Sequence, residues 1–263
     1  MLINRTRTVL AATALSLALV AGCGTSGDDD NDAGATTTEG SGSSTTEASK
    51  GDNGVADLSA DEILEKSRDA LRSAGSVHVE GEVTEDDEGL GINLSISEKG
   101  STGTLEISGN SVQLVVTSET VYMKGDEDFY SSLGTGGPAA AKLLAGKWLS
   151  VDADSPQGQN FAQIGEFDAF VDDFLDPGEV SKGETGSVGS TAAIALEDND
   201  EDEPAQLWVA TEGEPYPLQI NPKSSDSEKI TLSDFGEDVD VTPPPSDEVV
   251  SLEDLKNMGD SEN

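Results

Sequence analysis

Between residues 77 and 123, apolar and polar side chains alternate with a period of two, and this pattern limits the possible folds more than any other feature of the chain. Val77, Val79 and Val83 begin the series, and Gly81 interrupts their apolar side. The alternation returns at 90–96, 105–107, 112–116 and 121–123. Because successive side chains of a strand point to opposite faces, each run predicts a strand with one apolar and one wet face. Polar segments such as 99–101 separate the runs as turns, which predicts an antiparallel meander.

Helical patterns flank these strands. Ser59 is followed three residues later by Glu62, which predicts a capping box, and apolar residues at helical spacing continue as far as Gly75. A second helical segment is predicted at 161–175 from Phe and aliphatic residues that recur every three or four positions. A short helix is expected at 138–145, and further strands at 147–151, 188–196, 207–209, 218–220 and 230–232.

A large sheet with one apolar face must be covered, and the predicted helices are the available cover. We therefore expect an α+β fold in which a curved antiparallel β-sheet, a half-barrel, is wrapped around helices.

The amino terminus has the pattern of an export signal. Arg5 and Arg7 precede the apolar run 9–20, which is too short to be a good membrane span, and small residues then lead to the only cysteine, Cys23. Residues 20–23 read Val-Ala-Gly-Cys, which resembles a bacterial lipobox. We predict a lipoprotein signal peptide at 1–22 and lipidation of Cys23, with the mature protein anchored by lipid on the extracytoplasmic side of the cell membrane. An ordinary signal peptide that leaves an incidental thiol is the alternative.

Charge separates the remaining chain into regions. The 53 acidic residues face 14 basic ones, for a net charge of −39, so a nucleic-acid partner is not expected. We predict that residues 23–57 comprise the lipidated Cys and a disordered acidic tether of small residues, and that 246–263 form a flexible acidic tail. The half-barrel domain at 58–245 keeps 39 acids and 10 bases, so the acidity belongs largely to the folded surface.

Motifs for catalysis and for metal binding are weak. The chain has neither a Ser-x-x-Lys nor a Gly-x-Ser-x-Gly motif, and the single His78 falls on the polar side of its strand. The acidic runs at 28–39 and 197–203 depart from a calcium-loop template at the glycine position, which favours solvated segments. We expect no enzymatic activity, no metal, no cofactor and a monomer.

Several loose motifs resemble the LolA-like fold of the actinobacterial LppX and LprG lipoproteins. They lie at 121–125, 146–149, 207–209, 215–218 and 235–236, followed by three prolines at 243–245. This resemblance spans roughly 58 to 250, and it implies an apolar cavity between the concave sheet face and the helices, which holds acyl chains of lipids or lipoproteins. The extreme acidity departs from the family and leaves any shared preference for a lipid headgroup open.

The apolar residues of the sheet and helices can be interpreted in two ways, as the lining of a cavity or as a closed core. The function it implies is to bind or transport a hydrophobic ligand, with the membrane and the acylated ligand as partners. The candidate cavity residues are Leu71, Val79, Leu94, Ile96, Leu114, Val116, Met123 and Phe170. The alternative is a closed core in which these side chains pack against one another, as in an envelope sensor or scaffold that carries nothing. Trp148 and Trp208 fall at strand positions, where packing anchors are more common than ligand platforms.

Overall fold

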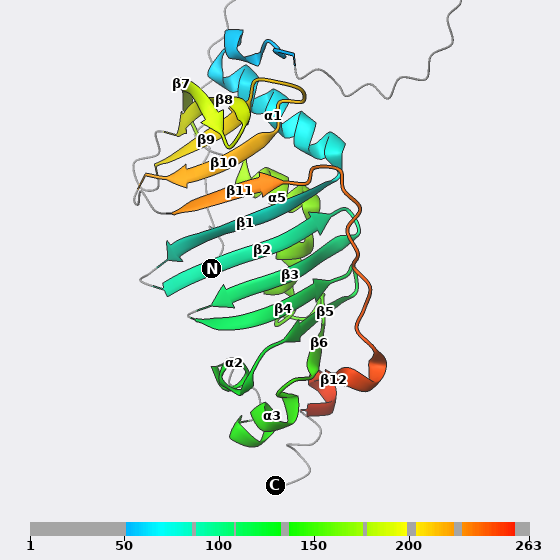
Figure 1. Ribbon diagram of the computed structural model, residues 1–263. Coiled ribbons are helices and arrows are strands. Elements are labelled where there is room, and N and C mark those ends of the chain that lie inside the picture. Colours follow the sequence, from blue (N-terminus) through cyan, green and yellow to red (C-terminus); the bar gives the residue numbers. More distant parts are fainter. Residues whose placement is uncertain are drawn as a thin grey trace, which may run out of the picture. The chain divides into compact units, whose positions relative to one another are not determined.

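The computed structural model describes residues 51–85, 88–107, 109–132, 137–175, 178–198, 204–223 and 228–255. In these ranges a single sheet of twelve strands runs in the order β12-β6-β5-β4-β3-β2-β1-β11-β10-β9-β8-β7 (Figure 1). The strands are β1 (Ser76–Glu85), β2 (Glu88–Ser97), β3 (Gly100–Ile107), β4 (Asn110–Val116), β5 (Thr120–Lys124), β6 (Trp148–Asp152), β7 (Val180–Val188), β8 (Thr191–Asp198), β9 (Ala205–Ala210), β10 (Pro217–Pro222), β11 (Lys229–Ser233) and β12 (Val249–Ser251).

The sheet is curved and does not close, because β12 and β7 are its two edges and do not pair with each other. Neighbouring strands are antiparallel except for β12, which pairs in parallel with β6 through Val249 and Trp148. The predicted α+β half-barrel is confirmed at this level, but the sheet is mixed and not purely antiparallel. The parallel pair arises because the chain returns along the sheet after β11 and adds its last strand at the far edge.

Short helices accompany the sheet. The α-helices are α1 (Ala60–Ala74), α2 (Glu127–Ser132), α3 (Gly137–Leu144), α4 (Gln159–Ala162) and α5 (Phe167–Phe174), and the 3₁₀ turns are η1 (Val55–Asp57), η2 (Gln163–Gly165) and η3 (Ser246–Glu248). α1 is confirmed as predicted. The Glu62 carboxylate accepts from the Ser59 amide at 2.9 Å, the Ser59 hydroxyl accepts from the Glu62 amide at 3.4 Å, and Gly75 ends the helix with φ 71°.

The helical segment predicted at 161–175 is divided. α4 ends at Ala162 and continues into η2, which ends at Gly165. The extended Glu166 follows with φ −89° and ψ 107°, and α5 then begins at Phe167. The periodicity of the Phe residues continues across this break, so the pattern alone does not reveal it. Figure 1 shows α5 behind the sheet and α1 across the strands β7 to β11.

Gly81 and Gly103 lie where neighbouring strands leave no room for a side chain. A Cβ at Gly81 would lie 2.2 Å from the carbonyl oxygen of Lys229, and one at Gly103 would lie 2.1 Å from that of Asn93. Gly103 also has φ 151°. Only glycine tolerates such an approach, and glycines of this kind mark strong local bends in sheets. Both therefore support the curvature that makes the inner face concave.

The described fold extends past both predicted domain boundaries. Val55 is 2% exposed, and the Asn53 side chain donates to the carbonyl oxygens of Ala210 and Gly213, both at 3.1 Å. The sequence pattern places these two residues in the tether. In the segment predicted as the acidic tail, β12 pairs with β6 and Leu252 is buried. Contacts with strands that are distant in the sequence thus extend the fold at both ends.

Candidate functional site

The inner face of the sheet carries two rows of buried side chains, aligned by the strand register. The first row runs from β1 to β6 through Val77, Ile96, Ser101, Val116, Val121 and Val151. The second row runs from β11 to β6 through Leu232, Val79, Leu94, Gly103, Leu114, Met123 and Leu149. Apart from Ser101 and Gly103, every member is aliphatic or Met. The rows form a continuous apolar strip across seven strands.

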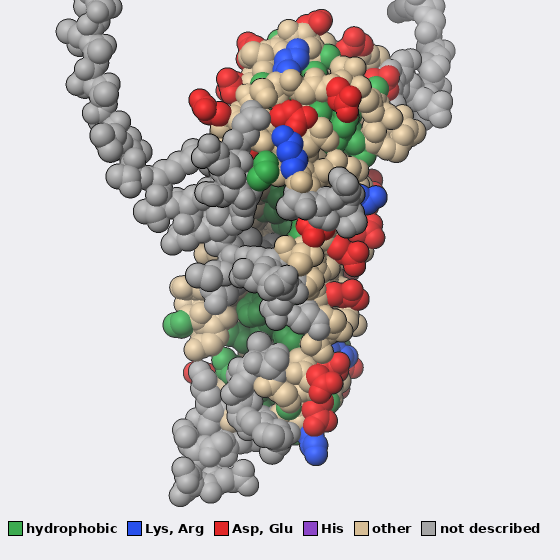
Figure 2. All heavy atoms as spheres, turned by 90° about the vertical axis from the view of Figure 1, so that its left-hand side faces the viewer, with side chains coloured by type: hydrophobic (Ala, Val, Ile, Leu, Met, Phe, Trp, Pro, Cys, Tyr) green, Lys and Arg blue, Asp and Glu red, His purple; other side chains and the backbone are tan. Residues whose placement is uncertain are grey.

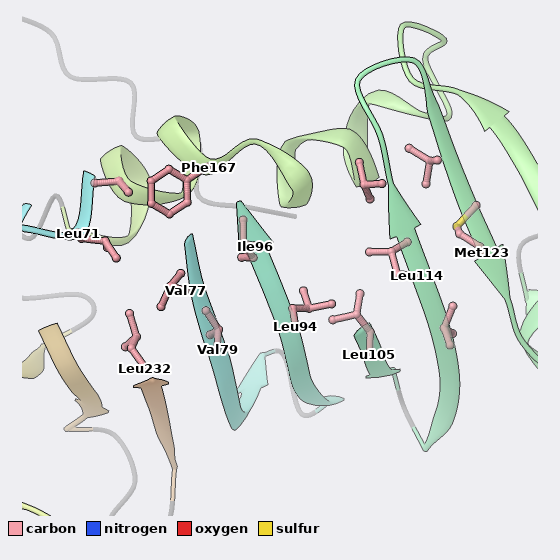
Figure 3. Close-up of a cluster of buried hydrophobic side chains, with 14 of the residues drawn as sticks. Leu71, Val77, Val79, Leu94, Ile96, Leu105, Leu114, Met123, Phe167 and Leu232 are labelled. Carbon is pink, nitrogen blue, oxygen red and sulfur yellow. The ribbon is translucent and has the colours of Figure 1, made fainter. Parts of the chain in front are cut away.

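The structure brings the eight predicted cavity residues together in one apolar cluster. Seven are 0–3% exposed: Leu71, Val79, Leu94, Ile96, Leu114, Val116 and Met123. Phe170 is only partly buried and packs against the edge of the cluster. In Figure 3, side chains from β1 to β5 point to the same side of the sheet, and Phe167 of α5 lies next to Leu71 of α1.

Phe167, and not the predicted Phe170, is the phenylalanine of α5 that is buried in the core. Phe167, Val171 and Leu175 are spaced by four residues and are 0–3% exposed, so they give α5 its buried face. Phe170 and Phe174 stack on each other, with ring centroids 4.8 Å apart, at the margin of that face. The predicted Phe170 is thus close in sequence to the central residue but lies one helical row away from it.

The turn η2 lies directly on the first row. A Cβ at Gly165 would lie 2.4 Å from Val116 Cγ1 and 3.3 Å from Ser101 Oγ. A side chain at this position would therefore require the cover or the sheet to move. The contact places Ser101 under η2, whereas the sequence pattern 99–101 predicts a turn there. The turn ends at Lys99, two residues earlier, and β3 begins at Gly100. The signal that could have found Ser101 is the period of two that connects it to Leu105.

The inner face is less well covered around Gly81 of β1. Ile220, Ile230 and Ile92 lie in register on both sides of Gly81, and all are only partly buried. Figure 2 views the side of the molecule where β1 and β3 end, and it shows hydrophobic side chains at the surface along the middle of that side. Acidic side chains are concentrated along one margin of the same view.

Polar groups are rare inside. Among the described residues, the buried polar or charged side chains are Ser67, Ser76, Ser97, Ser101 and Asp198. Two hydroxyl oxygens, those of Ser67 and Ser101, are buried and have no hydrogen-bond partner. The Tyr130 hydroxyl, by contrast, lies 3.0 Å from the carbonyl oxygen of Met123 and 2.8 Å from that of Lys147. Burial raises the pKa of the Tyr130 phenol, although hydrogen bonds with the backbone partly oppose this shift.

Two open surface pockets lie outside the predicted cavity. One, of about 320 Å³, contains His78, Ser95 and three acids, Asp234, Glu237 and Asp238, in its lining. The other, of about 430 Å³, lies along α1 between Arg68, Arg72 and Gly178. None of the eight predicted cavity residues lines either pocket. The seven buried candidates belong to the closely packed hydrophobic core.

The outer face is polar, as the alternation predicts. His78 faces outward, with Nδ1 3.1 Å from the Ser95 hydroxyl, and Glu80 and Glu82 on the same strand are exposed. Trp208 also lies on this side, where its indole N–H donates to Gln206 Oε1 at 2.8 Å. The benzene edge of Trp208 approaches Gly186, where an added Cβ would lie 2.9 Å from the ring. Trp208 therefore packs across neighbouring strands in the way expected of an anchor.

The predicted signal peptide and Cys23 lie outside the described residues. Within the described ranges, the helices lack the length and apolarity needed to cross a bilayer.

No protein-family model and no curated protein matches this chain. Among solved structures, the chain is similar to an uncharacterized conserved protein from Thermus thermophilus. That match has a TM-score of 0.38 and 12% sequence identity, and it covers 73% of this chain and 98% of the other.

Proposed function

We propose that this protein is a membrane-anchored, extracytoplasmic lipoprotein of the LolA-like type that binds or transports a hydrophobic ligand, a lipid or the acyl chains of a lipoprotein. The ligand occupies the inner face of the half-barrel after the cover moves aside. Cys23 carries the lipid anchor, and the protein works without catalysis as a monomer. The sequence motifs at the amino terminus and at 121–125 support this assignment.

The observation that carries the proposal is the contrast between a broad apolar sheet face and a discontinuous cover. The two buried rows cross seven strands, whereas α4, η2 and α5 have four, three and eight residues, and η2 is the part of this cover that lies next to Val116. Helical segments this short depend on tertiary packing for their stability. An acyl chain can replace the apolar contacts that they make, so ligand binding offsets the cost of displacing them.

The charge of the domain fits a carrier that stands clear of its own membrane. Exposed acids such as Glu80, Glu82 and Glu106 lie on the outer face. Anionic headgroups repel such a surface. The acidic surface therefore disfavours direct adsorption, and the acyl anchor holds the protein at the membrane.

One observation favours the second candidate function, a sensor or scaffold with a closed core. The predicted cavity residues other than Phe170 are 0–3% exposed and pack on one another. A protein of this kind keeps its inner face filled by its own side chains and uses its surface for contacts with partners.

Ligand binding separates the two candidates. We expect native mass spectrometry of the full chain carrying Cys23→Ala, which cannot be lipidated, to detect bound lipid, and a fluorescent fatty acid to bind in solution. An empty protein that also ignores the fluorescent fatty acid would contradict the carrier.

A bulky substitution provides the matched test. In a carrier, Leu114→Trp on the inner face blocks the ligand while the fold remains, and Gln113→Trp on the outer face of the same strand leaves binding unchanged. In a closed core, Leu114→Trp overpacks and destabilises the fold by about 1–3 kcal/mol. Binding of the fluorescent fatty acid and urea unfolding, measured for both variants, distinguish the carrier from the closed core.

The anchor is tested independently. Cys23→Ala removes the acyl mass and releases the protein from membranes into the medium, as measured by mass spectrometry and membrane fractionation. If the variant stays on the membrane, the assignment of Cys23 as the anchor is wrong.

A further inference from the structure

The hydroxyl of Ser101 is the feature of the inner face that core packing does not explain. Ser101 is 0% exposed, and its Oγ has no hydrogen-bond partner within the described part of the chain. Its neighbours in the row are Ile96 and Val116, in register on either side. A buried polar group without a partner destabilises the fold, and an aliphatic side chain at this position would avoid that penalty.

Ser67 carries the other buried hydroxyl without a partner among the described residues, but it has a backbone acceptor nearby that Ser101 lacks. Ser67 lies inside α1, where a serine hydroxyl can turn toward the carbonyl oxygen one helical turn earlier. The carbonyl groups next to Ser101 lie in the plane of the sheet and take part in the ladders with β2 and β4. The Ser101 hydroxyl points away from that plane, so its partner must come from the inner side.

The position of Ser101 limits where that partner comes from. η2 lies over it, since a Cβ at Gly165 would be 3.3 Å from Ser101 Oγ. When α4, η2 and α5 move away from the sheet, this hydroxyl faces the space that they leave. A ligand along the first row then passes within reach of one hydrogen-bond donor, with aliphatic side chains on both sides.

The charge of the interior limits the chemistry of the ligand at this point. No Lys, Arg or His is among the buried residues in the described part of the chain. A carboxylate or phosphate beside Ser101 would thus be an uncompensated buried charge, which is strongly unfavourable. An uncharged carbonyl oxygen needs one donor and no counter-ion.

We propose that Ser101 is a positioning and specificity-determining residue, whose hydroxyl donates a hydrogen bond to the uncharged carbonyl oxygen of an acyl ester held on the inner face. This proposal rests on the proposed carrier function and specifies its ligand. Ser101 fixes where along the first row the ester lies, and the acyl chain covers the aliphatic residues on either side.

The test compares two probes that differ in their hydrogen-bonding atoms. Diphenylhexatriene is a fluorescent hydrocarbon without oxygen, and methyl oleate carries one ester. Both are titrated into the full chain with Cys23→Ala, alone and combined with Ser101→Ala. Ser111→Ala is the matched control, because Ser111 lies exposed on the outer face of β4.

We expect diphenylhexatriene to bind all three proteins equally, and methyl oleate to displace it about 3- to 10-fold less effectively from the Ser101→Ala protein only. The infrared carbonyl stretch of bound methyl oleate should also lie at higher wavenumber in that variant, since the hydrogen bond that weakens the carbonyl bond is lost. A purely structural serine would not move this band.

The other outcomes are distinct. If diphenylhexatriene and methyl oleate both fail to bind any of the proteins, the carrier function itself is overturned. If both bind but Ser101→Ala changes neither methyl oleate displacement nor the carbonyl band, the role of Ser101 is overturned. If sodium oleate at pH 9 binds more tightly than methyl oleate, the preference for an uncharged oxygen is wrong.

Discussion

The Arg68 guanidinium on α1 donates to the carbonyl oxygen of Leu175, the residue that caps α5, with Nε at 2.6 Å and Nη2 on the same oxygen. Leu175 is 0% exposed, so this carbonyl lies at the margin of the core. A bifurcated bond from a charged donor is among the stronger hydrogen bonds available to a protein. It ties the helix that covers β7 to β11 to the helix that covers the first buried row.

We predict that Arg68→Met lowers the free energy of unfolding by about 1–3 kcal/mol, because the carbonyl of Leu175 loses a charged donor while the aliphatic stem is kept. Arg72→Met is the control. Arg72 pairs with Asp172, but their side chains are 42% and 64% exposed, so the loss should stay below about 1 kcal/mol. Urea unfolding measures both, and equal losses would contradict the role given to Arg68.

Gly165→Ala should destabilise the protein by about 1–3 kcal/mol, because the new methyl group would lie 2.4 Å from Val116 Cγ1 and must push the cover away. Val116→Ala removes the atom that it meets. In a double-mutant cycle by urea unfolding, we therefore expect the double variant to be more stable than the sum of the single losses implies. Strictly additive losses would mean that η2 does not press on the sheet at this point.

Gly103→Ala should cost more than about 3 kcal/mol, since its Cβ would meet the carbonyl oxygen of Asn93 and the backbone φ of 151° disfavours any side chain. Gly89→Ala serves as the comparison within the neighbouring strand. Apart from its chain neighbours, no atom of the described residues lies within 4 Å of a Cβ at Gly89, so this change should stabilise the protein by up to about 1 kcal/mol. If thermal unfolding shows Gly103→Ala to be more stable than Gly89→Ala, Gly103 is not needed for the curvature of the sheet.

Tyr130→Phe should destabilise the protein by about 1–2 kcal/mol at neutral pH, because the hydroxyl next to the carbonyl oxygens of Met123 and Lys147 is lost. Burial raises the pKa of folded Tyr130 above its ordinary value of 10.0. Ionisation then favours the unfolded chain, so the contribution of Tyr130 is complete below pH 10 and is lost as the pH rises above it. The difference between wild type and Tyr130→Phe should narrow above about pH 10 in urea unfolding, and a constant difference would contradict the buried environment.

The elements that could be predicted from sequence are those whose signal is local. The alternation at 77–83 and 90–96 predicts β1 and β2, and the pair Ser59 and Glu62 predicts the start of α1. In contrast, β12 depends on a parallel pairing with β6, a strand far earlier in the chain, and no local pattern encodes a partner at that distance. The same holds for the pairing of β1 with β11, which places the two halves of the sheet next to each other.

In the candidate site, too, the residues that could be predicted are those with a local sequence signal. The alternation identifies Leu94, Leu114 and Met123 as inner-face residues because a strand position fixes the face of its side chain. The period of two that connects Ser101 to Leu105 points to the same face, but glycine and serine after Lys99 have the composition of a turn, so the pattern is easily missed. The register with Ile96 and Val116 shows the side to which Ser101 points. Whether the inner face opens depends on volumes and contacts between distant segments, which composition does not specify.

A sheet that fails to close leaves two strands with unused hydrogen-bonding groups, and such edges can recruit other chains into fibrils. The edges of this half-barrel are poor templates. β12 has three residues, and β7 has an irregular register between Lys182 and Thr185 with the exposed charges of Lys182 and Glu184 next to the irregularity. A short edge and a distorted, charged edge both disfavour strand addition. The fold can therefore stay open on one side at high local concentration without polymerising.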